Sequence, residues 1–243
     1  TSLGERNVAW YKNDGAGNFG EQQIITANIW GAYSIYAIDL DNDGDNDVLS
    51  ASWNDNKIAW YENDGAGNFG EQQIIANNAN GITDIYAIDL DNDGNNDVLS
   101  ASFFDDKIAW YKNNGAGNFG TQQIITINAD KAYSVYATDL DGDGDNDILS
   151  ASANDNKIAW YANDGTGNFG TQQIISTNNN GAMCVYATDL DNDGDKDVLS
   201  ASYSDNKVVW YANDSAGNFG SQQIISTNAI GAIAVYATDL DND

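Results

Sequence analysis

Short apolar segments alternate with turns rich in Asn, Asp and Gly along the whole chain. Within one stretch, residues 85–88, 97–102, 107–111 and 119–125 are rich in β-branched, aromatic and small side chains and are bounded by turn residues. This pattern is typical of strands joined by tight turns. The apolar period of 3.6 residues that marks a helix is absent. The pattern therefore predicts an all-β protein with four short strands in this stretch.

The same pattern recurs every 50 residues, so the chain contains five copies of one unit. Four strands in about 50 residues, repeated, are typical of the blades of a β-propeller. The strands also carry apolar or small residues on both faces, as blades packed between two neighbours require. A β-solenoid is the main competitor, but its rungs are shorter and need no paired hairpins. We predict one domain over residues 1–243, a β-propeller of five four-stranded antiparallel blades.

The closing of the ring is a separate question. Five repeats of 50 residues would exceed the 243 present by seven, and the missing stretch matches Gly44 to Ser50. A closed ring would join Val235–Leu240 to the first unit, with its seam between Asp243 and Thr1 and one strand edge exposed. A part of a larger propeller, repeat array or multi-chain assembly would show the same cut. Closure is preferred because it removes edges.

An acidic loop of the form Asp-x-Asp-x-Asp-Gly-x-x-Asp follows the first strand of each unit. We number the four complete copies loop 1 (39–47), loop 2 (89–97), loop 3 (139–147) and loop 4 (189–197). Alternate carboxylates around a glycine turn suit Ca²⁺. Without a cation they would repel one another, which argues against a solvated turn. We predict one structural Ca²⁺ in each complete loop.

Position 7 of the loop varies between Asp and Asn, so we assign its backbone carbonyl, not its side chain, as the ligand. The predicted ligand residues are Asp39, Asp41, Asp43, Asp45 and Asp47; Asp89, Asp91, Asp93, Asn95 and Asp97; Asp139, Asp141, Asp143, Asp145 and Asp147; Asp189, Asp191, Asp193, Asp195 and Asp197; and, in the incomplete fifth copy, Asp239, Asp241 and Asp243.

Composition narrows the possible functions. The net charge of −28, from 37 acidic and 9 basic residues, argues against nucleic acid as a partner. The absence of histidine removes the usual general base, and Cys184, the single cysteine, cannot form an intrachain disulfide. No apolar run approaches the roughly 20 residues of a membrane span, so no membrane insertion is expected. No signal peptide is visible, yet calcium modules of this kind favour a secreted, extracellular protein.

The acidic loop and the segment Trp-Tyr-x-Asn-Asp-Gly-x-Gly-Asn-Phe-Gly together resemble the FG-GAP/VCBS repeat over essentially the whole chain. That family builds the integrin α-subunit propeller and a group of calcium-containing propeller lectins. The resemblance implies a β-propeller with calcium in the loops between first and second strands. The best-known members have seven blades, whereas five copies are present here.

Two other repeated features have a structural interpretation. The Asn-Asp-Gly-x-Gly-Asn-Phe-Gly segment at 63–70 lacks the Lys-Ser/Thr of a phosphate-binding loop and links two strands, so it is predicted to be a hairpin turn. One tryptophan recurs in every unit, and blade-to-blade packing is preferred over a repeated sugar-stacking platform. These tryptophans are Trp10, Trp60, Trp110, Trp160 and Trp210.

The nearly identical copies differ mainly in residues 28–34 and 53–56 and in their equivalents. In an up-and-down blade these segments emerge on one face, which we call the variable face. The acidic loops and Gly-rich turns emerge on the other, the metal face. Loops on a rigid scaffold commonly bind partners, and exposed aromatics with Asn suit sugar rings, although neutral drift is an alternative. The candidate ligand-binding residues are Trp30, Tyr33, Trp53, Asn54, Phe103, Phe104, Tyr133 and Tyr203.

Three functions remain as hypotheses. The preferred one is a secreted, calcium-stabilised, lectin-like module that binds a glycan or glycoprotein at weak sites between blades, gaining avidity from their number. The second is a structural or cell-adhesion repeat protein that self-associates or binds protein partners. The third, a polysaccharide lyase or hydrolase, is disfavoured because histidine is absent and the carboxylates lie mainly in metal loops. We therefore expect no enzymatic activity.

Overall fold

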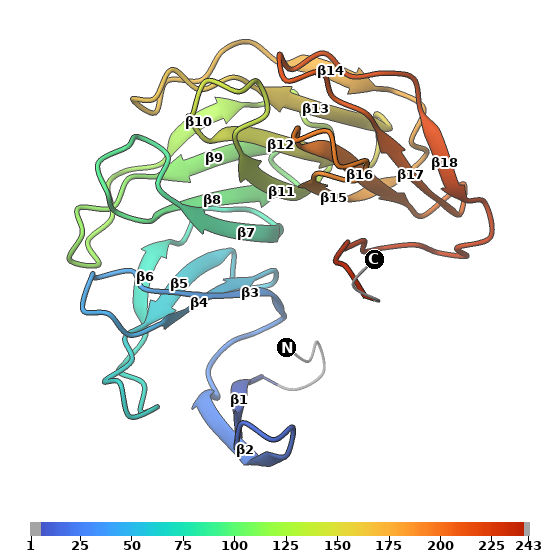
Figure 1. Ribbon diagram of the computed structural model, residues 1–243. Helices are drawn as coiled ribbons and strands as arrows, with labels where there is room; N and C mark the ends of the chain where they lie inside the picture. Colours follow the sequence, from blue (N-terminus) through green and yellow to red (C-terminus); the bar gives the residue numbers. More distant parts are fainter. Residues whose placement is uncertain (1–5, 241–243) are drawn as a thin grey trace.

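The computed structural model describes residues 6–240, and all regular structure in that range is β-strand. The strands form four four-stranded sheets and one two-stranded sheet (Figure 1). No helix in this range is long and apolar enough to cross a membrane. The predicted all-β architecture of four-stranded antiparallel propeller blades is confirmed.

Each four-stranded sheet consists of consecutive antiparallel strands, so each is an up-and-down blade. Blade 1 contains β3 (Ala32–Ile38), β4 (Asp47–Ser52), β5 (Lys57–Tyr61) and β6 (Gln73–Ala76). Blade 2 contains β7 (Ile82–Ile88), β8 (Asp97–Ser102), β9 (Lys107–Tyr111) and β10 (Gln123–Thr126). Blade 3 contains β11 (Ala132–Thr138), β12 (Asp147–Ser152), β13 (Lys157–Tyr161) and β14 (Gln173–Ser176). Blade 4 contains β15 (Ala182–Thr188), β16 (Asp197–Ser202), β17 (Lys207–Tyr211) and β18 (Gln223–Ser226), and the N-terminal sheet contains β1 (Val8–Asn13) and β2 (Phe19–Thr26).

The blades follow one another around a curve, with the N-terminal sheet at one end of the curve and blade 4 at the other (Figure 1). The first strand of each blade packs beside the first strand of the next, which places β3, β7, β11 and β15 in series. A tyrosine from each of these strands, and one from residues 232–238, contacts its neighbours through tilted rings whose centroids are 4.8–5.0 Å apart. This series is Tyr36, Tyr86, Tyr136, Tyr186 and Tyr236.

The hydrophobic core lies between blades, as expected for sheets that carry apolar residues on both faces. One cluster joins Leu49 and Trp60 of blade 1 to Val98 and Tyr111 of blade 2, and equivalent clusters follow at the next two interfaces. Trp60, like its equivalents in blades 2 and 3, is buried. At these three positions the tryptophans therefore pack between blades and present no open face to a ligand.

Three details differ from the sequence-based expectation. The first strand of blade 2 was predicted over 85–88, but β7 begins three residues earlier, at Ile82. The fourth strand of blade 2 was predicted over 119–125 but β10 spans Gln123–Thr126, because Phe119 pairs only with Asn113 in an isolated bridge. The fifth repeat is divided: β1 and β2 occupy the positions of its third and fourth strands, and residues 232–238 occupy that of its first, without strand pairing. The predicted seam between Asp243 and Thr1 lies outside the described residues, and ring closure stays a prediction.

Candidate functional site

Each acidic loop joins the first two strands of its blade and brings aspartate side chains together. In every complete loop, oxygen atoms of three aspartates lie within 4.8 Å of one another. The clusters are Asp39, Asp41 and Asp43; Asp89, Asp91 and Asp97; Asp139, Asp141 and Asp147; and Asp189, Asp191 and Asp197. Oxygen ligands at such spacing are those that Ca²⁺ uses in proteins.

The last aspartate of each loop also closes the loop onto the Gly-rich turn. Asp47 is fully buried, and its two carboxylate oxygens accept hydrogen bonds from the backbone N–H groups of Leu40 and Asn63, both at 2.9 Å. The same pair of bonds recurs at Asp97, Asp147 and Asp197. Burial raises the pKa of Asp97 and of Asp147 to about 7. A cation beside these carboxylates would offset the free energy of burying their charge.

The third-position aspartates carry the clearest sign that a ligand belongs in the loops. One oxygen, Oδ1, of Asp41, Asp91 and Asp141 is buried and has no hydrogen-bond partner. In loop 4 the buried atom without a partner is Oδ1 of Asp189. Buried polar atoms in folded proteins are almost always satisfied. The residues present therefore fit a cation, which would satisfy these oxygens.

The side chains at position 7 of loops 2, 3 and 4 accept hydrogen bonds, and those of loops 2 and 3 do so from the neighbouring blade. Asn42 of loop 1 donates to Oδ1 of Asn95 in loop 2 at 2.7 Å, and Asn92 of loop 2 donates to Asp145 in loop 3 at 2.6 Å. In loop 4 the partner lies within the same blade, because Ser215 of the blade 4 Gly-rich turn donates to Asp195. Because the side chains of Asn95, Asp145 and Asp195 already accept these hydrogen bonds, the arrangement is compatible with the assignment of the backbone carbonyl as the ligand.

The remaining predicted ligands differ in their surroundings. The fifth-position carboxylates accept the backbone N–H of position 7 at 2.9–3.0 Å; these are Asp43, Asp93, Asp143 and Asp193. In the incomplete fifth copy Asp239 is exposed, and Asp241 and Asp243 lie outside the described residues.

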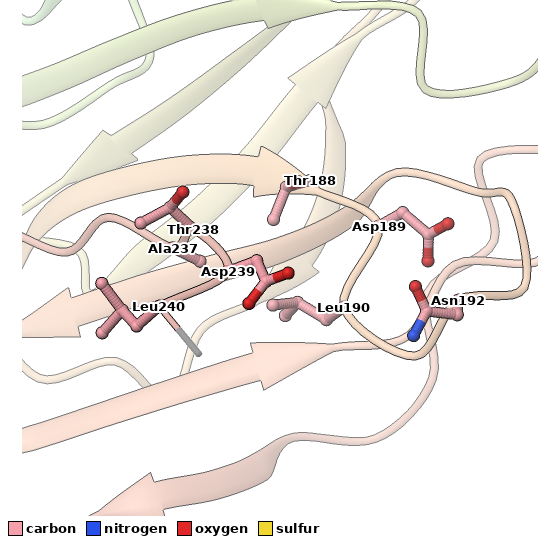
Figure 2. Close-up of a pocket in the computed structure, with 8 residues that line it drawn as sticks. All are labelled: Thr188, Asp189, Leu190, Asn192, Ala237, Thr238, Asp239 and Leu240. Carbon is pink, nitrogen blue, oxygen red and sulfur yellow. The ribbon is translucent and has the colours of Figure 1, made fainter. Parts of the chain in front are cut away.

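A cavity of about 480 Å³ lies between loop 4 and the C-terminal segment (Figure 2). Its walls include Asp189, Asn192 and Asp239. At the preceding interface, between blades 3 and 4, Asn213 donates to the carbonyl of Leu140 at 2.7 Å. The cavity thus lies at the position that, between blades 3 and 4, is filled by Asn213 and its Gly-rich turn.

The two variable segments of each blade lie side by side at the opposite ends of the strands. The N–H of Trp53 donates to the carbonyl of Gly31 at 2.9 Å, and that of Phe103 donates to Gly81 at 3.0 Å. Since the acidic loops and Gly-rich turns are joined to each other at the other ends, the structure has a metal face and a variable face, as the sequence predicted.

Five candidate ligand-binding residues from three blades form one cluster on the variable face. We call it the aromatic cluster: Tyr33, Trp53, Phe103, Phe104 and Tyr133. Trp53 stacks on Tyr33 with centroids 5.6 Å apart and lies 5.2 Å from both Phe103 and Phe104. The hydroxyl groups of Tyr33 and Tyr133 are hydrogen-bonded to each other. Phe104 is 58% exposed and so offers an apolar surface to a partner.

The other three candidates stand apart from these ring contacts. Trp30 is 52% exposed and lies under the guanidinium of Arg6, 5.2 Å from its centroid. Asn54 is exposed, and its N–H donates to the carbonyl of Trp30. Tyr203, on blade 4, is 53% exposed and is absent from the aromatic contacts found in residues 6–240.

Sequence reasoning missed three charged residues near these sites. Lys131 lies over Phe103, its Nζ 5.3 Å from the ring centroid. Asp84 accepts from Ser34 Oγ at 3.0 Å and from Val135 N–H at 3.1 Å, so it joins three blades; burial raises its pKa to about 6. Lys112 pairs with carboxylates of loop 2. Each could have been found by comparing copies, because each replaces an uncharged residue in at least two other copies.

The chain matches the sequence model of the FG-GAP-like repeat in five overlapping segments: residues 2–50, 39–100, 89–150, 139–200 and 189–243. A comparison with curated protein sequences gave no match.

Solved structures with the same fold include a lectin of Agrocybe aegerita that recognises non-reducing terminal N-acetylglucosamine. It is 19% identical with a TM-score of 0.67, and the match covers 93% of this chain and 62% of the lectin. A protein from Lactobacillus plantarum is 20% identical with a TM-score of 0.69, covering 95% of this chain and 68% of that protein. Virginiamycin B lyase from Staphylococcus aureus is 18% identical with a TM-score of 0.53, covering 83% of this chain and 58% of the lyase. At this identity the likeness concerns the fold alone.

Proposed function

The chain belongs to the FG-GAP-like repeat family, and from that premise we propose that it is a non-enzymatic, extracellular, calcium-stabilised propeller that binds carbohydrate through its variable face. The metal face stabilises the blades, and the aromatic cluster receives the ligand. One of the propellers with this fold is a lectin, although another is a lyase.

The calcium part of the proposal is supported by the four aspartate clusters and their unpartnered buried oxygens. A Ca²⁺ in each loop would satisfy these oxygens and reduce the repulsion within a chain of net charge −28. Its role would be structural, because the loops offer no histidine or other free base beside the ion. The proposal also places the protein in a calcium-rich, secreted setting.

The carbohydrate part rests on one observation, the gathering of five aromatic side chains from three blades into one cluster. Exposed aromatic faces flanked by polar groups suit the apolar faces of sugar rings. Lys131 supplies a charged group beside the rings, over Phe103. The sequence suggested several equivalent sites between blades, whereas this grouping favours one principal site over blades 1–3.

The experiment is a glycan-array screen in saturating Ca²⁺, followed by titration of the best ligand against variants. Phe104→Ala should weaken binding at least about tenfold, as expected when a central aromatic contact is lost. Tyr203→Ala is the matched control, an equally exposed aromatic on blade 4, and should leave affinity unchanged. Absence of any glycan binding, or equal losses in both variants, would contradict the proposal.

Self-association is a second candidate with its own supporting observation. Ile230, Ile233, Tyr236 and Leu240 expose large apolar surfaces on the C-terminal segment, which has no strand pairing in residues 232–240. An unpaired segment with exposed apolar side chains is a site for contact with another chain. Light scattering coupled to size exclusion separates the two cases, since a monomer near 26 kDa would exclude self-association at the concentration used.

A further inference from the structure

We propose that Lys112 makes loop 2 the weakest of the four calcium loops, and that the residue following the third strand of each blade sets the affinity of its own loop. This inference rests on the proposed calcium binding. It concerns a difference between loops whose repeated motif is almost the same.

Lys112 directly follows β9 and reaches across to the loop of its own blade. Its Nζ lies 3.0 Å from Oδ2 of Asp93 and in closer contact with Oδ2 of Asp91. The Asp91 side chain is only 6% exposed, so the ammonium group pairs with a carboxylate inside the proposed ligand cluster. Among the ion pairs of residues 6–240, only those of Lys112 involve a loop carboxylate.

The same position differs in the other three four-stranded blades, and the lysine recurs only in the N-terminal sheet, as Lys12. Glu62 follows β5 in blade 1, and Ala162 and Ala212 follow the third strands of blades 3 and 4. Glu62 thus places a carboxylate beside loop 1 at the position from which Lys112 reaches loop 2. The alanines cannot reach their loops with a charge.

Charge therefore ranks the loops. Loop 1 has five aspartates and the nearby Glu62, whereas loop 2 has four aspartates, an asparagine at position 7 and the ammonium of Lys112. Calcium affinity in such loops rises with the number of carboxylate charges. A positive charge held against two of the ligands must move away before the ion enters, and it repels the ion afterwards.

Two features indicate that Lys112 weakens the site without blocking it. Its side chain is 46% exposed, so it can turn into water when an ion enters. The Oδ1 atom of Asp91 remains buried and without a hydrogen-bond partner although Lys112 contacts the other oxygen. Part of the site thus stays available to Ca²⁺. We expect loop 1 to fill first, loop 3 next, then loop 4, which carries Lys196 at position 8, and loop 2 last.

The experiment follows the amide signals of Gly44, Gly94, Gly144 and Gly194 by ¹⁵N NMR while Ca²⁺ is added to metal-free protein. Each of these N–H groups donates to the first aspartate of its own loop, at 2.8–3.0 Å, so each signal reports on one loop. In the wild-type protein the Gly94 midpoint should lie at the highest Ca²⁺ concentration.

Variants separate the charge of Lys112 from its packing. Lys112→Met keeps the apolar stem, and the Gly94 midpoint should fall about tenfold while the Gly44 midpoint stays in place. Lys112→Arg keeps the charge and should leave Gly94 as the last signal to move. Glu62→Gln should raise the Gly44 midpoint and leave Gly94 unchanged.

The outcomes distinguish this inference from the proposed function on which it rests. If none of the four signals moves at millimolar Ca²⁺, calcium binding itself is wrong. If all four move together, or if Lys112→Met leaves the Gly94 midpoint unchanged, calcium binding stands and the role of Lys112 is overturned.

Discussion

The two faces of the propeller are built from the same repeat but use it differently. On the metal face every blade presents almost the same residues, and buried carboxylates are held by the same hydrogen bonds in all four blades. On the variable face the blades differ, and aromatic side chains of three blades contact one another. The metal face keeps the same residues in every blade because each blade must pair a buried carboxylate. In residues 6–240 the variable face buries no such repeated charge, so its residues can differ between blades.

The same contrast separates stability from binding. A change on the metal face disturbs hydrogen bonds between side chains and backbone that connect a loop, a turn and a neighbouring blade. A change at an exposed ring of the variable face removes surface that packs on few neighbours. Variants on the metal face should therefore act on the free energy of unfolding, and variants on the variable face on affinity for a ligand.

Removal of calcium should have the largest effect on stability, and it tests whether the metal face stabilises the fold. A site occupied at 100 times its Kd stabilises the fold by about 2.7 kcal/mol, so four sites together give about 10 kcal/mol, comparable to the whole stability of many domains. A chelator should therefore lower Tm by about 20 °C or more in differential scanning calorimetry. Restoring Ca²⁺ is the control. An unchanged Tm would contradict the claim that calcium on the metal face stabilises the fold.

Replacement of a single buried aspartate should have the next largest effect. Asp147→Ala leaves two backbone N–H groups, those of Leu140 and Asn163, without their acceptor and should cost about 3–5 kcal/mol in chemical denaturation. Asp145→Ala is the control, because it removes the same charge from the same loop but only an exposed hydrogen bond from Asn92. Equal losses in the two variants would contradict the structural role of the last loop position.

The effect of pH should change sign with calcium. In the folded protein the pKa of Asp47 is about 6 and those of Asp97 and Asp147 are about 7, above the ordinary value of 3.8. Without metal the folded state therefore binds more protons than the unfolded state, so stability rises as pH falls from about 7 towards 5 and is lost as pH rises again. With Ca²⁺ present, protons compete with the ion for the carboxylates, so stability should fall as the pH falls from about 7 towards 5.

The measurement is the Tm at pH 5 and at pH 7, each with Ca²⁺ and with chelator. The change in Tm between the two pH values should have opposite signs in the two conditions. Parallel pH profiles in the two conditions would show that these carboxylates do not hold the metal.

The smallest change in stability is expected for a variant on the variable face. Phe104→Ala removes an exposed ring and should shift Tm by no more than about 2 °C. A loss of stability as large as that of Asp147→Ala, with both variants measured by the same chemical denaturation, would mean that the aromatic cluster holds the blades together instead of presenting a surface.

Much of this organisation could be predicted from the sequence, because the period and the turn residues set strand positions directly. The second and third strands of blade 2, Asp97–Ser102 and Lys107–Tyr111, coincide with the prediction. The fourth strand was overextended at Phe119, where local residue preference favours a strand but the paired geometry begins only at Gln123.

The sites were less predictable because they depend on contacts between repeats. The sequence identified the loop aspartates as candidate ligands. Only the structure shows that the Asp47 carboxylate accepts hydrogen bonds from two backbone N–H groups, and that the side chain at position 7 of loop 2 accepts one from the neighbouring blade. Likewise, the candidate aromatics were chosen as separate positions, and their convergence from blades 1, 2 and 3 depends on how adjacent blades are placed.

The most direct test of this division is a crystal structure with Ca²⁺ and the glycan selected by the array. The account predicts one metal ion in each complete loop on the metal face and the sugar over the aromatic cluster near Phe104. A sugar bound beside the acidic loops, or loops that remain without metal at saturating Ca²⁺, would contradict it.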